Sequence, residues 1–161
     1  MCSFSYPFQQ NNNLLYFTGF NEPDCCFFLS KSSSSVLSVN FFVTPNDESS
    51  LLWSGPRAGI EGSRDIFGLQ NTFDIKKLKD AVEAFKDQNI FIDYHPENSA
   101  FPVELYKLIS KSSKPLEPFM TKLRLVKCEE ELELMKKSGS IASESFKAVI
   151  TRYIFIFINH F

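Results

Sequence analysis

Histidine and metal-binding spacings are scarce in this 161-residue sequence. Its two histidines, His95 and His160, lie far apart, and no CxxC or CxH spacing occurs among its four cysteines. Because the common zinc sites depend on such spacings, we expect no zinc site in this chain. Neighbouring side chains on a strand point to opposite faces, so two adjacent cysteines do not serve one site. The sequence predicts reduced, mostly buried thiols at Cys2, Cys25, Cys26 and Cys128.

An excess of positive charge is also lacking. Lys plus Arg number 17 against 19 for Asp plus Glu, which gives a formal net charge of -2. A duplex-binding protein needs a positive field to replace counterions, so we expect no nucleic-acid partner. The chain opens without the pattern of a secretory signal, and no apolar run approaches the ~20 residues that span a bilayer. We therefore expect a soluble, intracellular protein without a membrane partner.

Three apolar runs in the first third of the chain are predicted to be strands. They cover residues 14–18, 25–30 and 36–43, and they are uniformly apolar rather than alternating. That pattern is typical of strands covered on both faces. Gly, Asn and Pro within residues 19–24 predict a tight reversal, and the short polar segment 31–35 predicts an antiparallel pair of strands around it.

Helices and one further strand are predicted to alternate after residue 57. The helices cover residues 58–67, 74–85, with Asp74 as cap, and 101–110, and the strand covers residues 90–94. Alternation of this kind predicts an α/β fold in three layers, a mixed sheet with helices on both faces. Residues 111–118 are rich in Ser, Lys and Pro and are predicted to be a linker or a domain edge.

The most regular helix is predicted over residues 128–150. Apolar or small residues recur at spacings of three and four, and three glutamates occupy the first turn, where the helix dipole favours negative charge. The stripe consists of Leu132, Met135, Gly139, Ala142, Phe146 and Val149. Tyr153–Ile158 is β-prone, uncharged and without proline, so residues 151–161 are interpreted as an aggregation-prone tail. The alternative is a buried final strand.

Four blocks of this sequence resemble the aminopeptidase P (Xaa-Pro aminopeptidase) family, in its bacterial and mitochondrial branch. In order, they are YPFQQN at 6–11, LYFTGFNEPD at 15–24, LWSGPRAG at 52–59 and KLRLVK at 122–127. The first three belong to the family's amino-terminal domain, and the fourth lies where its catalytic domain begins. The resemblance implies a creatinase-type amino-terminal fold and an intracellular location, either mitochondrial or cytoplasmic.

The family's activity is the release of an amino-terminal residue that precedes proline, and its usual cofactor is manganese. Two bridged metal ions activate a water for attack on the peptide carbonyl. The family's metal ligands, two Asp, one His and two Glu, belong to a carboxy-terminal domain of which we find no counterpart here. The resemblance therefore implies three parts: an amino-terminal domain at 1–118 with an incomplete start, the first catalytic segment at 119–150 and a non-family tail at 151–161. We assign no catalytic and no metal-binding residue to this chain.

Trp53 is the one candidate site residue. The resemblance implies a homo-oligomer in which this tryptophan reaches into the active site of a neighbouring subunit and contacts the peptide. The alternative is a tryptophan packed within its own domain. Two pairs of ionisable residues, Glu22 with Asp24 and Asp93 with His95, are also considered as catalytic pairs. Neither has a third group that would orient it for catalysis. Asp24 is predicted to be a turn residue instead.

Two functional hypotheses follow for the chain as a whole. The first is the inactive amino-terminal part of a manganese-dependent Xaa-Pro aminopeptidase. The second is an interaction module that associates with full-length subunits and modulates their assembly.

Overall fold

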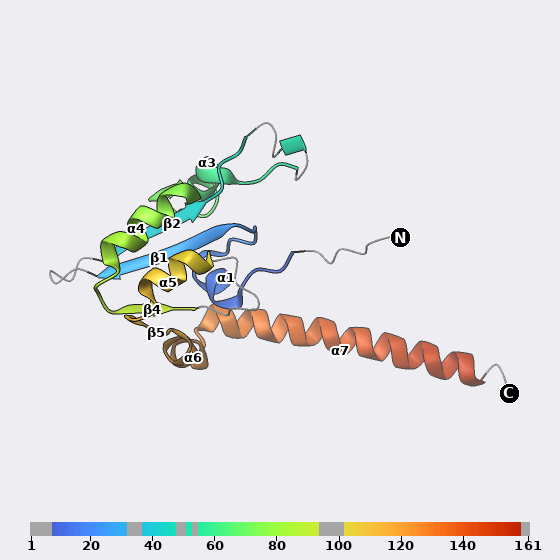
Figure 1. The fold of residues 1–161 in the computed structure, drawn as a ribbon. Helices are drawn as coiled ribbons and strands as arrows, with labels where there is room; N and C mark the ends of the chain where they lie inside the picture. The colour runs from blue at the N-terminus through green and yellow to red at the C-terminus, as the bar shows by residue number, and fades with distance from the viewer. Residues whose placement is uncertain (1–7, 32–36, 48–50, 53–54, 94–101, 159–161) are drawn as a thin grey trace. The chain divides into compact units, whose positions relative to one another are not determined.

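The protein's fold is taken from a computed structural model that describes residues 8–31, 37–47, 51–52, 55–93 and 102–158. The chain divides into two compact units, Met1–Leu116 and Glu117–Phe161. Figure 1 shows the course of the chain through both. The division assigned to residues 1–118, 119–150 and 151–161 is one of family content, and it stays a prediction.

The first unit is built on a three-stranded mixed sheet with the order β1-β2-β3. Strands β1 (Cys25–Lys31) and β2 (Leu37–Val43) are antiparallel, with Cys25 opposite Val43. Strand β3 (Thr72–Asp74) runs parallel to β2 on its other side. A second, two-stranded parallel sheet pairs β4 (Ile90–Ile92) with β5 (Ser113–Pro115). The predicted antiparallel pair and mixed sheet are confirmed.

Both faces of the three-stranded sheet are covered by apolar side chains. On one face, Phe42 packs in a cluster with residues of helices α4 (Leu78–Phe85) and α5 (Val103–Ile109). On the other face, Phe41 and Val43 pack with Phe20, against which lie residues of α1 (Asn12–Thr18) and α3 (Gly59–Asp65). Alternate residues of one strand thus enter two different cores. The three-layer α/β fold is confirmed.

The two adjacent cysteines follow the same alternation. Cys25 packs against the cluster around Phe41, and Cys26 packs against the cluster around Phe42. They therefore lie on opposite faces of the sheet, as the sequence predicts.

The prediction of a strand over residues 14–18 is wrong, because Asn12–Thr18 forms helix α1. The Asn11 side chain accepts hydrogen bonds from the backbone N–H of Asn13 and Leu14, which caps the helix start. Gly19 ends the helix with φ of 67°. Composition alone does not distinguish a short apolar helix from a buried strand. Here the N-cap at Asn11 favours the helix.

Residues 111–118 are not a linker, since they contain β5 and the start of α6 (Glu117–Leu125). The alternative, a domain edge, agrees with the division of the chain between Leu116 and Glu117. Parallel pairing with β4 is a long-range effect that local composition does not reveal. The structure confirms the helix capped by Asp74, whose side chain accepts from the Lys76 N–H at the start of a 3-10 turn, η1 (Ile75–Lys77), that leads into α4.

The second unit consists of α6 and the long helix α7 (Glu129–Ile158). Helix α7 continues eight residues beyond the predicted end at Ile150. The β-prone run Tyr153–Ile158 is therefore helical rather than a final strand. The side chains of Tyr153 and Ile154 are 66% and 51% exposed, so these two residues enter no core. Among the described helices, none is long and apolar enough to cross a membrane.

Candidate functional site

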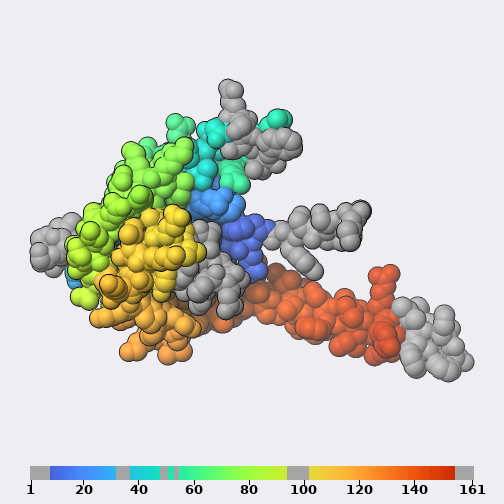
Figure 2. Space-filling view, viewed as in Figure 1, coloured from blue at the N-terminus to red at the C-terminus, as the bar shows by residue number. Residues whose placement is uncertain are grey.

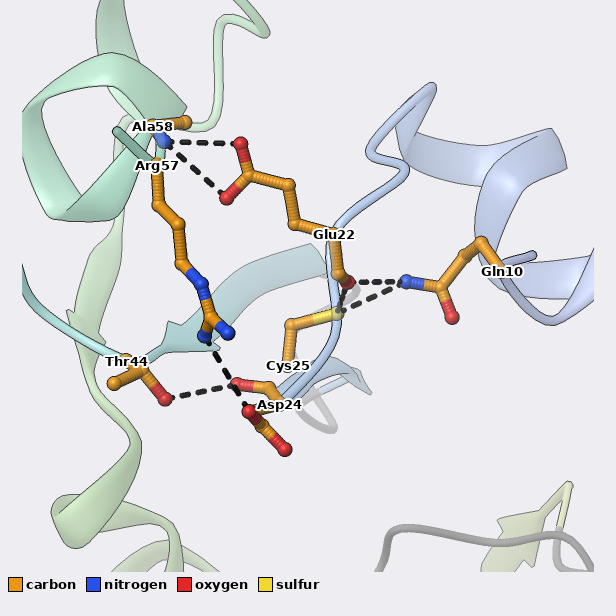
Figure 3. A network of polar contacts seen from close by, with 7 residues as sticks. All are labelled: Gln10, Glu22, Asp24, Cys25, Thr44, Arg57 and Ala58. Carbon is orange, nitrogen blue, oxygen red and sulfur yellow. Dashed lines mark hydrogen bonds and ion pairs between the residues drawn. The ribbon is translucent and has the colours of Figure 1, made fainter. Parts of the chain in front are cut away.

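Three of the sequence blocks that carry the family resemblance contribute residues to one network at one end of the three-stranded sheet. The turn at residues 19–24 and the segment 55–59 are brought together by a network of polar contacts (Figure 3). We call this network the polar clasp. Its residues are Gln10, Glu22, Asp24, Cys25, Thr44, Asn46, Arg57 and Ala58.

Glu22 connects the turn to the start of helix α3. Its two carboxylate oxygens accept from the Ala58 N–H at 3.0 and 3.2 Å. Ala58 is the residue that precedes α3, and it offers no side-chain cap of its own. A carboxylate is stabilised at this end of a helix, where backbone N–H groups are unpaired. Glu22 therefore supplies from a distant part of the chain the cap that α3 lacks locally.

Asp24 forms the second connection. Its φ of 58° lies in the left-handed region, which aspartate tolerates better than most residues. The Arg57 guanidinium lies 3.4 Å from the Asp24 carboxylate, and the Thr44 hydroxyl donates to the Asp24 carbonyl at 3.4 Å. The assignment of Asp24 as a turn residue is confirmed. An exposed ion pair of this kind contributes only about 0–1 kcal/mol, so its main effect is to orient Arg57.

Gln10 closes the clasp on the side of the thiol. Its amide donates to the Glu22 carbonyl at 2.8 Å and to the Cys25 sulfur at 3.3 Å. Burial raises the pKa of Cys25 to about 12, with smaller contributions from the neighbouring carboxylates, and burial raises that of Cys26 to about 12 as well. A thiol that stays protonated at neutral pH is a poor nucleophile and a poor metal ligand. In the clasp, the Cys25 thiol therefore takes part as a hydrogen-bonding group.

The clasp also includes a contact across the segment 46–57. The Asn46 side chain donates to the Arg57 carbonyl at 2.7 Å, which joins the two ends of segment 46–57. Within it, the Leu51 and Gly55 N–H groups donate to the Asp47 and Leu51 carbonyls. A compact loop with joined ends is a common way to present side chains from a rigid base. We call residues 46–57 the clasped loop.

Trp53, the one predicted site residue, belongs to the clasped loop but lies outside the described residues. Its neighbour Leu52 is 79% exposed, and Leu51 is 43% exposed. Leu51 and Leu52 are thus large apolar side chains exposed to solvent, in a segment whose ends are joined by a hydrogen bond. Exposed apolar side chains that lie together are typical of a contact surface.

The other candidate pairing from the sequence, Asp93 with His95, does not form a catalytic or metal-binding group among the described residues. Asp93 accepts from the Asn13 amide at 2.7 Å, which joins β4 to α1, and His95 lies outside the described residues. In the described parts of the chain, no three His, Cys, Asp or Glu side chains are grouped so that they could hold a metal ion. The arrangement of Asn46, Thr44 and Gln10 was not predicted, because each hydrogen bond joins segments distant in sequence.

Comparison with known families assigns the same part of the chain. The family model that matches, over residues 2–91, is described as the N-terminal domain of aminopeptidase P. That match covers the polar clasp, the clasped loop and all of the three-stranded sheet.

Individual relatives agree with this assignment. The chain is 28% identical over 168 residues to intermediate cleaving peptidase 55 of Saccharomyces cerevisiae, with 91% of this chain and 33% of that protein covered. It is 31% identical over 153 residues to Xaa-Pro aminopeptidase 3 of Dictyostelium discoideum, covering 91% of this chain and 30% of that protein. Among solved structures, zinc-substituted Escherichia coli aminopeptidase P in complex with product shares the fold, with a TM-score of 0.72, 21% identity, and coverage of 88% of this chain and 35% of that one. The chain thus spans about a third of the length of these proteins.

Proposed function

Because the chain belongs to the aminopeptidase P family through its N-terminal domain, we propose that it is the non-catalytic part of a Xaa-Pro metalloaminopeptidase. In this proposal the intact enzyme depends on manganese and releases an amino-terminal residue that precedes proline. The polar clasp supports the proposal most directly, since it uses residues of three family blocks and joins the ends of the segment that carries Trp53. The intact enzyme is a homo-oligomer located in the mitochondrion or the cytoplasm.

The role of the domain is to present the clasped loop to the peptide. Trp53 supplies a large flat apolar surface, and such a ring packs well against a proline side chain. Arg57 and Glu22 hold the loop base through contacts within the domain, to Asp24 and to the Ala58 N–H. Fixing a binding loop in advance reduces the entropy that is lost when peptide binds.

The metal chemistry of the intact enzyme belongs to another part of it. The described residues provide no set of ligands for a metal ion, so no step of the hydrolysis is assigned to them. We accordingly expect the purified 161-residue chain to release no residue from a Xaa-Pro peptide, with or without added manganese. Manganese-dependent release that co-purifies with the 18.5 kDa chain would contradict this part of the proposal.

The role of Trp53 is tested by transplanting the domain. We propose a chimera in which residues 1–116 replace the matching domain of the yeast relative, assayed on a peptide with proline at its second position. Trp53→Ala should raise KM at least several-fold, because an aromatic contact to the peptide is lost. Leu52→Ala, which truncates the neighbouring apolar side chain, is the matched control and should leave KM within twofold. Equal effects of the two substitutions would refute substrate contact by Trp53.

An interaction module is the second candidate, and the exposure of α7 favours it. Met135, Phe146 and Val149 are 57%, 70% and 65% exposed, although all three are large and apolar. Such a face is available to another polypeptide. Co-expression of this chain with the full-length yeast relative tests this function, with a complex of both on a sizing column as the expected result.

A further inference from the structure

One peptide group in the polar clasp is held from two opposite sides by side chains distant in sequence. The carbonyl of Arg57 and the N–H of Ala58 belong to the same peptide bond. The Asn46 amide donates to the carbonyl oxygen at 2.7 Å, and the Glu22 carboxylate accepts from the nitrogen at 3.0 and 3.2 Å. Figure 3 shows the Glu22 side of this arrangement. Because a peptide group is planar, contacts at its oxygen and its nitrogen fix the orientation of the whole plane.

The two contacts on this peptide group strengthen each other. A carboxylate on the N–H polarises the group and makes its carbonyl oxygen a better acceptor, as in chains of hydrogen bonds. Asp24 adds an ion pair to the Arg57 side chain at 3.4 Å, so Arg57 is held through its backbone and its side chain together. Beyond the peptide bond, Gly59 lies close to the Asn46 amide, since an added Cβ would come within 2.8 Å of Nδ2. The Asn46 amide is thus confined between the two residues that flank Ala58.

The peptide group closes the clasped loop at residues 46–57. Inside the loop, the Leu51 and Gly55 N–H groups donate to the carbonyls of Asp47 and Leu51 at 3.1 and 3.2 Å, so two successive turns connect its first residues to Gly55. In Figure 2 the teal residues of this segment lie at the margin of the first unit, apart from the green helix α4 and the yellow helix α5. The contact of Asn46 with the Arg57 carbonyl joins the two ends, and the ends set the orientation of the loop on the unit.

We propose that Asn46 and Glu22 are positioning residues, which orient the loop that carries Trp53 by holding the Arg57–Ala58 peptide group from opposite sides. In the intact enzyme this inference rests on the proposed function, since the orientation of Trp53 matters there if the ring contacts the peptide. A ring that is already oriented loses less freedom when the peptide binds. The positioning residues therefore lower KM and leave the chemical step unchanged.

The positioning role is tested in the full 161-residue chain through the fluorescence of Trp53, its single tryptophan. Asn46→Asp keeps the shape of the side chain and removes the donor. It should increase the fraction of the Trp53 anisotropy that decays within nanoseconds about twofold, because the loop moves more freely. Asn71→Asp is the matched control: Asn71 is also exposed, and its amide donates to the Val39 carbonyl at 3.1 Å, outside the loop. It makes the same change in charge and hydrogen bonding and should leave the anisotropy decay unchanged.

Glu22→Gln is the second variant, since it retains an acceptor for the Ala58 N–H and loses the charge. It should shift the anisotropy decay in the same direction. The double variant should exceed Asn46→Asp only slightly, because both contacts act on one peptide group. Circular dichroism checks the fold of each variant, and Asn46→Ala replaces Asn46→Asp if the new charge prevents folding. Equal effects at Asn46 and Asn71, or effects at Asn46 and Glu22 that add in full, would overturn the proposal.

The consequence for catalysis is measured in the chimera with the yeast relative. Asn46→Asp should raise KM about threefold at unchanged kcat, whereas Asn71→Asp should leave both unchanged. In a Trp53→Ala background, Asn46→Asp should raise KM no further. If Trp53→Ala itself leaves KM unchanged, the proposed function fails, while the anisotropy decay still decides whether Asn46 and Glu22 orient the loop. An equal rise in KM from Asn46→Asp with and without Trp53 would overturn the positioning of that ring.

Discussion

Gly59 lies where the polar clasp approaches the backbone most closely. Its φ is +60°, and a Cβ placed on it would lie 2.8 Å from the Asn46 amide nitrogen and 3.3 Å from the Asn46 backbone nitrogen. Position 59 therefore requires glycine for two reasons. The positive φ disfavours other residues, and Asn46 leaves no room for a Cβ. The block at 52–59 contains this glycine for a reason that only the folded structure reveals, because Asn46 is distant from it in sequence.

We predict that Gly59→Ala lowers the free energy of unfolding by about 2–3 kcal/mol, of which about 1–2 kcal/mol is strain from the positive φ. Gly68→Ala is the matched control: its φ is +67°, but nothing lies within 4 Å of the added Cβ. Urea unfolding of both variants separates strain from steric overlap. If Gly68→Ala is destabilised as much as Gly59→Ala, contact with Asn46 is not important.

The partly buried thiols of Cys25 and Cys26 make stability depend on alkaline pH. Burial raises the pKa of Cys25 and of Cys26 from the ordinary 9.0 to about 12. Between these values the unfolded chain releases protons that the folded chain still holds. The stabilisation is therefore complete below pH 9, and it is lost as the pH rises toward 12.

We predict that the free energy of unfolding falls above pH 9 by up to about 1.4 kcal/mol per pH unit for each thiol. Cys26→Ala should reduce this slope, whatever its effect on stability at pH 7. Chemical unfolding at pH 7.5, 9.0 and 10.0 measures the slope in both proteins. An unchanged slope in the Cys26→Ala variant would mean that this thiol titrates normally in the folded state.

At the scale of the element, the N-cap at Asn11 favours a helix over a strand in the apolar segment that forms α1. The Asn11 side chain accepts hydrogen bonds from the N–H groups of Asn13 and Leu14 at 2.8 and 3.2 Å. We predict that Asn11→Ala costs about 1 kcal/mol of stability, the usual value for a lost N-cap. Asn12→Ala is the matched control, since Asn12 is exposed and lies in the same turn. Thermal unfolding compares the two, and equal melting temperatures would show that the cap does not stabilise α1.

The elements that the sequence predicts correctly are those whose signal is local. Strands β1 and β2 follow from uniformly apolar runs, and α4 follows from the Asp74 cap and the spacing of Leu78 and Val82, which are 3% and 4% exposed. The wrong predictions lie where the structure depends on contacts between residues distant in sequence. Strand β5 contains Ser113 and Pro115 and exists because it pairs with β4. The clasp, likewise, joins residues up to 36 positions apart, as between Glu22 and Ala58.

At the scale of the whole molecule, stability is distributed unevenly between the two units. Strand β2 is paired on both sides, and Phe41 and Val43 are 0% and 2% exposed within its cores. Along α7, by contrast, the described side chains from Leu132 to Ile154 are exposed, so its backbone hydrogen bonds are maintained by the helix alone. Segments with few buried contacts open at low free energy, whereas core strands open only when the domain unfolds.

Hydrogen exchange on a dilute sample therefore discriminates between the units. We predict that the amides of Leu132–Val149 exchange at least a hundredfold faster than those of Phe41–Val43, because an isolated helix frays without an apolar partner. Protection along α7 equal to that of β2 would show that the helix is covered within its own chain.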